Sequence, residues 1–151
     1  MIEKATKYDV DWMVDLSHQK RLAYSIVHPN FYKMAKNSDE VQKGYFLDEL
    51  ANKDVIALTY REKQGFIMGK IINPPDVYDS GLTLMIDDFC VANDSLWMII
   101  GKALLDECQK IAKEMGAVQV LVVCGDHDQQ KSRLLKDLNM KIASNWFNKL
   151  L

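Results

Sequence analysis

The segment 82–116 constrains the fold of this chain more than any other. An extended, mostly apolar run (82–91) leads through a short polar loop (92–95) into a long helical pattern with a glycine, Gly101, where the loop becomes the helix. Such a junction directs free backbone N–H groups and the positive end of the helix dipole at one point. The segment therefore predicts a binding site for an anion such as a pyrophosphate group.

Length and composition restrict the class of protein. The chain has 151 residues and is 48% hydrophobic, which predicts one domain, 1–151, with a sizeable core. Its net charge is −2, so we expect no nucleic-acid partner. No apolar run approaches the roughly 20 residues that cross a bilayer, and the first residues lack a signal-peptide pattern, so we expect a cytoplasmic protein without membrane contact.

The spacing of apolar residues predicts the remaining elements. We expect strands at 2–6, 55–60, 66–72, 82–91, 117–124 and 140–147. We expect helices at 8–27, 31–34, 37–50, 102–115 and 126–138. The run 117–124 is almost wholly apolar, which is typical of a strand buried on both faces. This order of elements predicts an α/β fold with a mixed sheet and helices on its faces.

Two stretches carry a family likeness. Ile86, Phe89 and Val91 follow an apolar-x-x-apolar-x-Val pattern in the strand. The frame from Leu96 to Gly101, followed by Lys102-Ala103-Leu104-Leu105, matches a Gln/Arg-x-x-Gly-x-Gly/Ala motif at its end. With the order of elements over essentially the whole length, these stretches resemble the GNAT family of N-acetyltransferases. The resemblance implies an acyl-CoA acyltransferase fold, with a central, mostly antiparallel sheet and helices on both faces.

The chain departs from the family pattern at several positions. Leu96 stands where the family has arginine or glutamine, and Ile99 stands at the first glycine position. In the last helix, Lys131 stands where the family often has alanine, and Leu135 where it often has the tyrosine credited with protonating the departing thiolate.

The resemblance implies acetyl-CoA (coenzyme A) as the cofactor. Backbone N–H groups near Gly101 would bind its pyrophosphate, and a side chain at Gly101 could block that approach. Leu96 offers no charge to the phosphates, and Lys102 could partly compensate. Main-chain groups of the preceding strand could pair with the pantetheine amides, as in strand addition. The expected cofactor-binding residues are Phe89, Cys90, Val91, Ile99, Ile100, Gly101, Lys102 and Ala103.

Acetyl transfer to an amine requires the neutral amine, whereas a free alkylamine, with a pKa of about 10.4, is mostly protonated at neutral pH. Asp87 and Asp88 are the leading candidates for the base. Strand alternation predicts that they point to opposite faces, so that one of them faces the cleft. The third catalytic candidate is His127, which could act as base or acid because histidine titrates near neutrality. The alternative for His127 is a surface position beside a helix cap.

Partners and metals are less constrained. The acceptor could be a small-molecule or protein amine. The final strand, with Trp146 and Phe147, could pair or pack across a two-fold axis, so a homodimer is possible. His18 and His28 lie ten residues apart without partners at ligand spacing, so we expect no metal site.

Three functions remain open at this point. The first is an acetyl-CoA-dependent N-acetyltransferase, favoured by Gly101 and the Asp87-Asp88 pair. The second is a non-catalytic acyl-CoA-binding or regulatory module, and the third is an interaction domain that keeps only the fold. Leu96, Ile99 and Leu135 favour the second and third.

Overall fold

The computed structural model describes residues 1–151 and contains one five-stranded sheet with the order β1-β2-β3-β4-β5. Neighbouring strands are antiparallel except β4 and β5, which are parallel. The strands are β1 (Ile2–Lys4), β2 (Val55–Tyr60), β3 (Gly65–Ile72), β4 (Thr83–Val91) and β5 (Gln119–Val122). Strands β2 and β3 form an antiparallel hairpin, and the predicted mixed sheet is confirmed.

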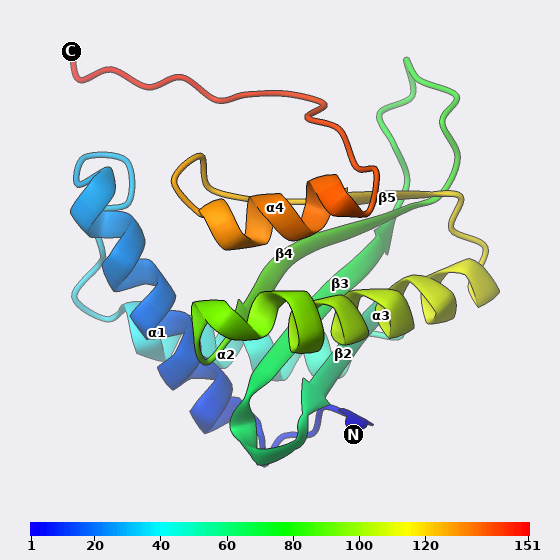
Figure 1. Cartoon of the computed structure of the whole chain (residues 1–151), viewed down its shortest axis with the longest axis horizontal. Coiled ribbons are helices and arrows are strands. Elements are labelled where there is room, and N and C mark those ends of the chain that lie inside the picture. The colour runs from blue at the N-terminus through cyan, green and yellow to red at the C-terminus, as the bar shows by residue number, and fades with distance from the viewer.

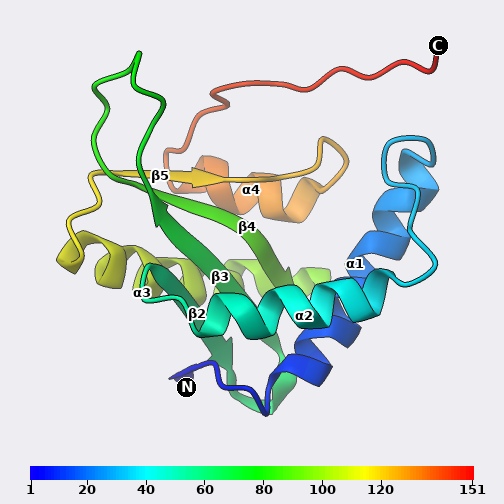
Figure 2. The same ribbon diagram turned by 180° about the vertical axis from the view of Figure 1, so that it is seen from behind.

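Four α-helices cover the two faces of the sheet. They are α1 (Val10–Val27), α2 (Ser38–Leu50), α3 (Lys102–Glu114) and α4 (Gln129–Asp137). Figure 1 shows α3 and α4 in front of the sheet, and Figure 2 shows α2 on the opposite side with α1 beside it. None of these helices combines the length and the hydropathy needed to cross a bilayer.

Each face of the sheet has its own hydrophobic core. Phe89 of β4 packs with Leu104 and Cys108 of α3 on one face, and Phe46 of α2 packs with Phe66 of β3 on the other. All five side chains are fully buried. Burial of large apolar side chains stabilises each by about 1.5–3 kcal/mol relative to exposure, so both layers are firmly attached to the sheet.

Two of the predicted strands differ from the structure at the β5 edge. The strand predicted at 117–124 is shorter, and it is half-exposed rather than buried on both faces. The strand predicted at 140–147 does not form: the chain there is irregular, and Trp146 and Phe147 are 86% and 93% exposed. The two differences have one cause, because β5 remains the edge of the sheet when no sixth strand pairs with it. Figure 1 shows the final segment leaving the body of the molecule beyond α4.

The prediction of a helix at 31–34 is also wrong. This stretch forms a turn, in which the Tyr32 N–H donates to the His28 carbonyl (2.9 Å). Pro29 lies inside the turn and lacks the N–H that a continuing helix needs. As a result α1 ends at Val27, and the chain reverses there before α2 begins.

Candidate active site

The parallel strands β4 and β5 separate halfway along β4. Their pairing ends at Ile86 and Val122, and the last bond between them is donated by the Val123 N–H to the Ile86 carbonyl (2.9 Å). Strand β4 continues to Val91 without a strand on that side. The open edge at 87–91 can therefore accept an extended ligand by main-chain pairing.

A β-bulge lies where the open edge begins. Met68 pairs with Asp88 and Gly69 pairs with Ile86, so Asp87 is an extra residue in β4. A bulge interrupts the strict alternation of side chains along a strand. The prediction that Asp87 and Asp88 point to opposite faces is therefore wrong, since both line the same cavity.

This cavity is small and acidic. It has a volume of about 110 Å³ and receives Tyr45 and Glu49 from α2 in addition to the two aspartates. Lys70, the lysine that lines this cavity, donates to Glu49 (3.2 Å). It does not form an ion pair with Asp87 or Asp88. Such a site suits a small cationic group.

The two aspartates differ in environment. Asp87 is exposed, whereas Asp88 is half-buried. Burial raises the pKa of Asp88, and the negative charge of Asp87 raises it further, although Lys20, Lys131 and Arg21 act in the opposite direction. A carboxylate with a raised pKa is a stronger base, which is the property that general-base catalysis uses.

Lys131 is a functional candidate that the sequence pattern did not single out. It extends from α4 into the core, is fully buried, and its ammonium lies 5.3 Å from the Phe89 ring centroid and 5.5 Å from that of Trp97. Its Nζ has no hydrogen-bond partner, and burial lowers the pKa of the amine to about 8. The sequence contains one signal for the burial of Lys131. It lies three residues before the apolar Leu134, and residues at that spacing share a helix face.

The backbone before α3 differs from the expected phosphate loop. It is already helical from Asp94, with a 3₁₀ turn at Asp94–Leu96 and a π-helical turn at Trp97–Gly101. The Lys102 N–H donates to the carbonyls of Trp97 and Ile99, so this predicted phosphate donor is engaged within the helix. The Lys102 side chain pairs with Asp106 one turn further on.

Gly101 has a packing role in this helix. A Cβ at this position would lie 2.6 Å from Cε3 of Trp97 and 3.3 Å from Cδ2 of Leu134. The glycine thus permits close contact of α4 and the Trp97 ring with the start of α3. This packing contact by itself explains why residue 101 is glycine, and no bound phosphate is needed for the explanation.

The other predicted cofactor-binding residues belong to the open end of β4 and to the start of α3. Phe89 and Cys90 are buried on opposite faces of β4, and Val91 ends the strand. Ile99 is 70% exposed, whereas Ile100 is buried and Ala103 is half-buried. Phe89 packs edge-on against Trp97 with 4.8 Å between ring centroids, so the open edge of β4 lies beside the turn that precedes α3.

His127 belongs to a different cluster from the two aspartates. It lies in the loop between β5 and α4, where its ring packs edge-on against Tyr24 with 4.4 Å between ring centroids. Its neighbours also include His28 and Asp126. The structure thus brings Asp87 and Asp88 together and does not bring His127 into their cavity.

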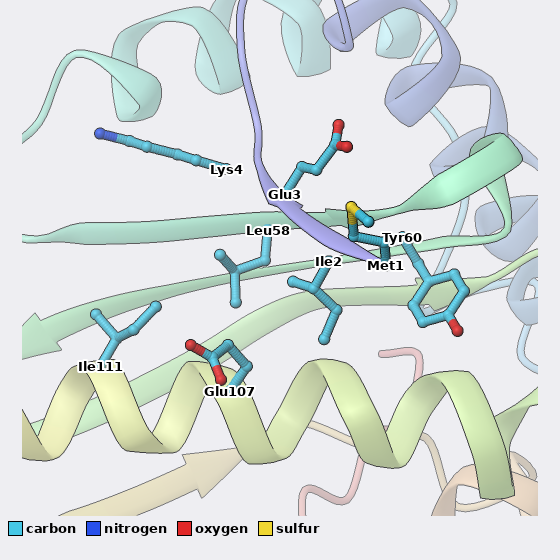
Figure 3. A pocket seen from close by; sticks show the side chains of 8 residues that line it. All are labelled: Met1, Ile2, Glu3, Lys4, Leu58, Tyr60, Glu107 and Ile111. Carbon is cyan, nitrogen blue, oxygen red and sulfur yellow. The ribbon is translucent and has the colours of Figure 1, made fainter.

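A second, larger cavity lies at the opposite edge of the sheet. Its volume is about 540 Å³, and β1, β2 and α3 line it. Figure 3 shows Ile2 and Leu58 directed toward α3, with Lys4 and Glu3 pointing away. None of the predicted catalytic or cofactor-binding residues lines it, so we assign the candidate site to the β4 edge.

No protein-family model matches the sequence, and no curated protein is significantly similar to it. Solved structures do match. A tetramutant of the BH1408 protein from Bacillus halodurans is 17% identical with a TM-score of 0.86, over 100% of this chain and 99% of that one. A predicted acetyltransferase with acetyl-CoA from Clostridium acetobutylicum is 18% identical with a TM-score of 0.72, over 99% and 95%. An aminoglycoside N-acetyltransferase in complex with CoA is 11% identical with a TM-score of 0.72, over 100% and 93%.

These likenesses establish the fold. The chain has the mixed-sheet architecture of the GNAT-like acyl-CoA acyltransferases, with helices on both faces, as the sequence resemblance implied.

Proposed function

We propose that the chain is an acetyl-CoA-dependent N-acetyltransferase that acetylates a primary amine of a small molecule or protein by direct attack. One observation carries the proposal: Asp87 and Asp88 line one acidic cavity at the point where the edge of β4 becomes open. A cationic amine in this cavity would be adjacent to a strand edge that can hold an extended thioester.

Asp88 is the proposed base. The ammonium form of the acceptor is attracted by the exposed Asp87 charge, and Asp88 accepts the proton that the amine must lose. Its raised pKa reduces the difference in proton affinity between the amine and the carboxylate. Tyr45 of α2 lines the same cavity and could orient the acceptor.

The residues around the open edge fit acetyl-CoA in two respects. The main chain of Phe89, Cys90 and Val91 could pair with the pantetheine amides, because no strand occupies that edge. The unpartnered Lys131 ammonium supplies a positive charge between β4 and the start of α3, which suits a polyanionic coenzyme. When bound, acetyl-CoA supplies a thioester whose acetyl group forms a C–N bond with the amine as the C–S bond breaks. Because Leu135 cannot donate a proton, the thiolate released with the electron pair of the C–S bond would take its proton from solvent.

A second function is favoured by the residue at position 135. The packing of Trp97 and Leu134 on Gly101, the engaged Lys102 N–H and the leucine at position 135 all remove features that a GNAT enzyme would use. Leu135 favours a non-catalytic module that binds an acyl-CoA without turnover, whereas the packed Gly101 and the engaged Lys102 N–H weaken coenzyme binding in either function.

Calorimetric titration with acetyl-CoA and with CoA, followed by a thiol-release assay, separates the two functions. The acceptor panel should contain a polyamine, an aminoglycoside and a lysine peptide. Binding with thiol release that depends on an acceptor supports the enzyme. Binding without release supports the module, and no binding up to millimolar concentrations would exclude both.

A further inference from the structure

Two histidines and an aspartate from distant parts of the chain meet at one end of the molecule. His28 follows the last residue of α1, and Asp126 and His127 lie in the loop that precedes α4. His28 and Asp126 are separated by 98 positions in the sequence, yet His28 Nε2 lies 2.7 Å from Asp126 Oδ1. His127 Nδ1 lies 3.3 Å from the same oxygen.

The three side chains converge closely enough to share one ligand. One ligand atom from each residue lies within 4.8 Å of those of the other two. Both imidazoles approach a single carboxylate oxygen, so two ring nitrogens depend on one acceptor. With the proton of each neutral imidazole on its other ring nitrogen, a divalent cation could accept a lone pair from each of the three donor atoms.

We propose that His28, Asp126 and His127 bind a divalent transition-metal ion. Two imidazole nitrogens and one carboxylate oxygen form a donor set that Zn²⁺ and its neighbours in the first transition row accept. The Asp126 side chain is 76% exposed, so an ion can enter from solvent and keep an open position for water. The expected class of ligand is therefore Zn²⁺ or a similar borderline ion, rather than Mg²⁺ or Ca²⁺, which prefer oxygen donors alone.

The surroundings hold one of the two rings in place. Tyr24 packs against the His127 ring, its hydroxyl donates to Asp128 (3.1 Å), and it accepts a bond from the Gly125 N–H (3.4 Å). A Cβ at Gly125 would lie 2.8 Å from Cε1 of His127, so this loop is closely fitted to the ring. His127 Nε2 is buried without a partner, which leaves Nδ1 as the nitrogen that shares a ligand with His28.

Binding at this point would connect α1 to the loop between β5 and α4. The hydrogen bonds between these two segments come from Tyr24 and His28. An ion that binds only the folded arrangement stabilises it according to its free concentration and affinity. The site thus predicts a metal-dependent clamp between segments that flank the separated ends of β4 and β5.

The test uses the full chain without a histidine tag, freed of metal by a chelator and then dialysed. Titration with ZnCl₂ should show one ion per chain and a raised Tm, and Co²⁺ should give visible absorption bands. The variants H28A, H127A and D126N should each weaken Zn²⁺ binding by at least about 10-fold. Circular dichroism confirms that each variant is folded.

His18 provides the matched control. It also contacts an aspartate, Asp39 (2.8 Å), but it does not belong to a cluster with a second histidine. Wild-type affinity in H18A, together with weakened binding in H28A and H127A, supports the site. Unchanged binding in H28A and H127A, equal loss in H18A, or no Zn²⁺ binding by the wild type would overturn it.

Discussion

Asp87 and Asp88 are adjacent on β4, yet both line the same cavity, because Asp87 is the extra residue of a β-bulge opposite β3. Two neighbouring carboxylates on a regular strand would be separated by the sheet. Here the negative charge of Asp87 contributes to the raised pKa of Asp88.

Replacing Asp88 tests the proposed base. We expect D88N to lower kcat by about 10²- to 10³-fold, because the amine loses its proton acceptor. D87N should mainly raise KM, since the exposed Asp87 attracts the cationic acceptor. Steady-state kinetics with the best acceptor measure both. Unchanged turnover in both variants would remove the aspartates from the chemistry.

The pH profile provides a separate test of Asp88. Its raised pKa means that protonation inactivates the base at a higher pH than for an ordinary aspartate, so kcat/KM should fall as the pH drops through that pKa. In D87N the neighbouring negative charge is gone, so the acidic limb should move to lower pH. An acidic limb that stays in place in D87N would contradict the coupling.

Lys131 links stability to pH. Its pKa is lowered from 10.5 to about 8 in the folded protein, so the unfolded chain binds the proton more tightly. Stability should therefore rise as the pH increases from about 8 to 10.5, and is reduced at neutral pH by at most about 3 kcal/mol. We expect K131M to be more stable than the wild type at pH 7 and to lose much of this dependence. Denaturant unfolding at several pH values measures it.

The same variant tests the role of Lys131 toward the coenzyme. If its ammonium compensates the charge of acetyl-CoA, K131M should bind acetyl-CoA about 10-fold more weakly while being more stable. Calorimetry on the folded variant measures the affinity. Equal affinity in K131M and wild type would restrict Lys131 to a packing role.

Gly101 and Gly44 form a matched pair for helix packing. G101A places a Cβ 2.6 Å from Trp97 and should destabilise the chain by about 1–3 kcal/mol. Gly44 in α2 has nothing within 4 Å of such a Cβ, so G44A should be neutral or stabilising by up to about 1 kcal/mol. Chemical unfolding of both compares them. Equal effects would show that the contact with Trp97 and Leu134 does not require glycine.

The homodimer stays a prediction, and the final segment is the place to test it. Trp146 is 86% exposed and meets the body of the molecule through an edge contact with Phe31. We expect sedimentation to show a dimer that W146S and F147S weaken, because these rings would be buried by a second copy. A wild-type monomer at high concentration would contradict it.

The sequence alone determined the elements whose patterns are local. Strands β2, β3 and β4 lie where the spacing of apolar residues predicted them. Helix α3 was equally evident from its apolar face and ends before Gly116, which has a φ of +95°. The order of elements predicted the mixed α/β sheet, and the resemblance to the GNAT family implied the particular fold.

Only the tertiary structure decided the site. The bulge at Asp87 depends on the register between β3 and β4, and the exposure of β5 depends on whether the segment 140–147 joins the sheet. Lys131 is buried because α4 packs on Phe89 and Trp97, and His28 meets Asp126 across 98 positions. Periodicity reports the preferences of neighbouring residues, whereas these features arise from contacts between distant segments, whose geometry no local pattern records.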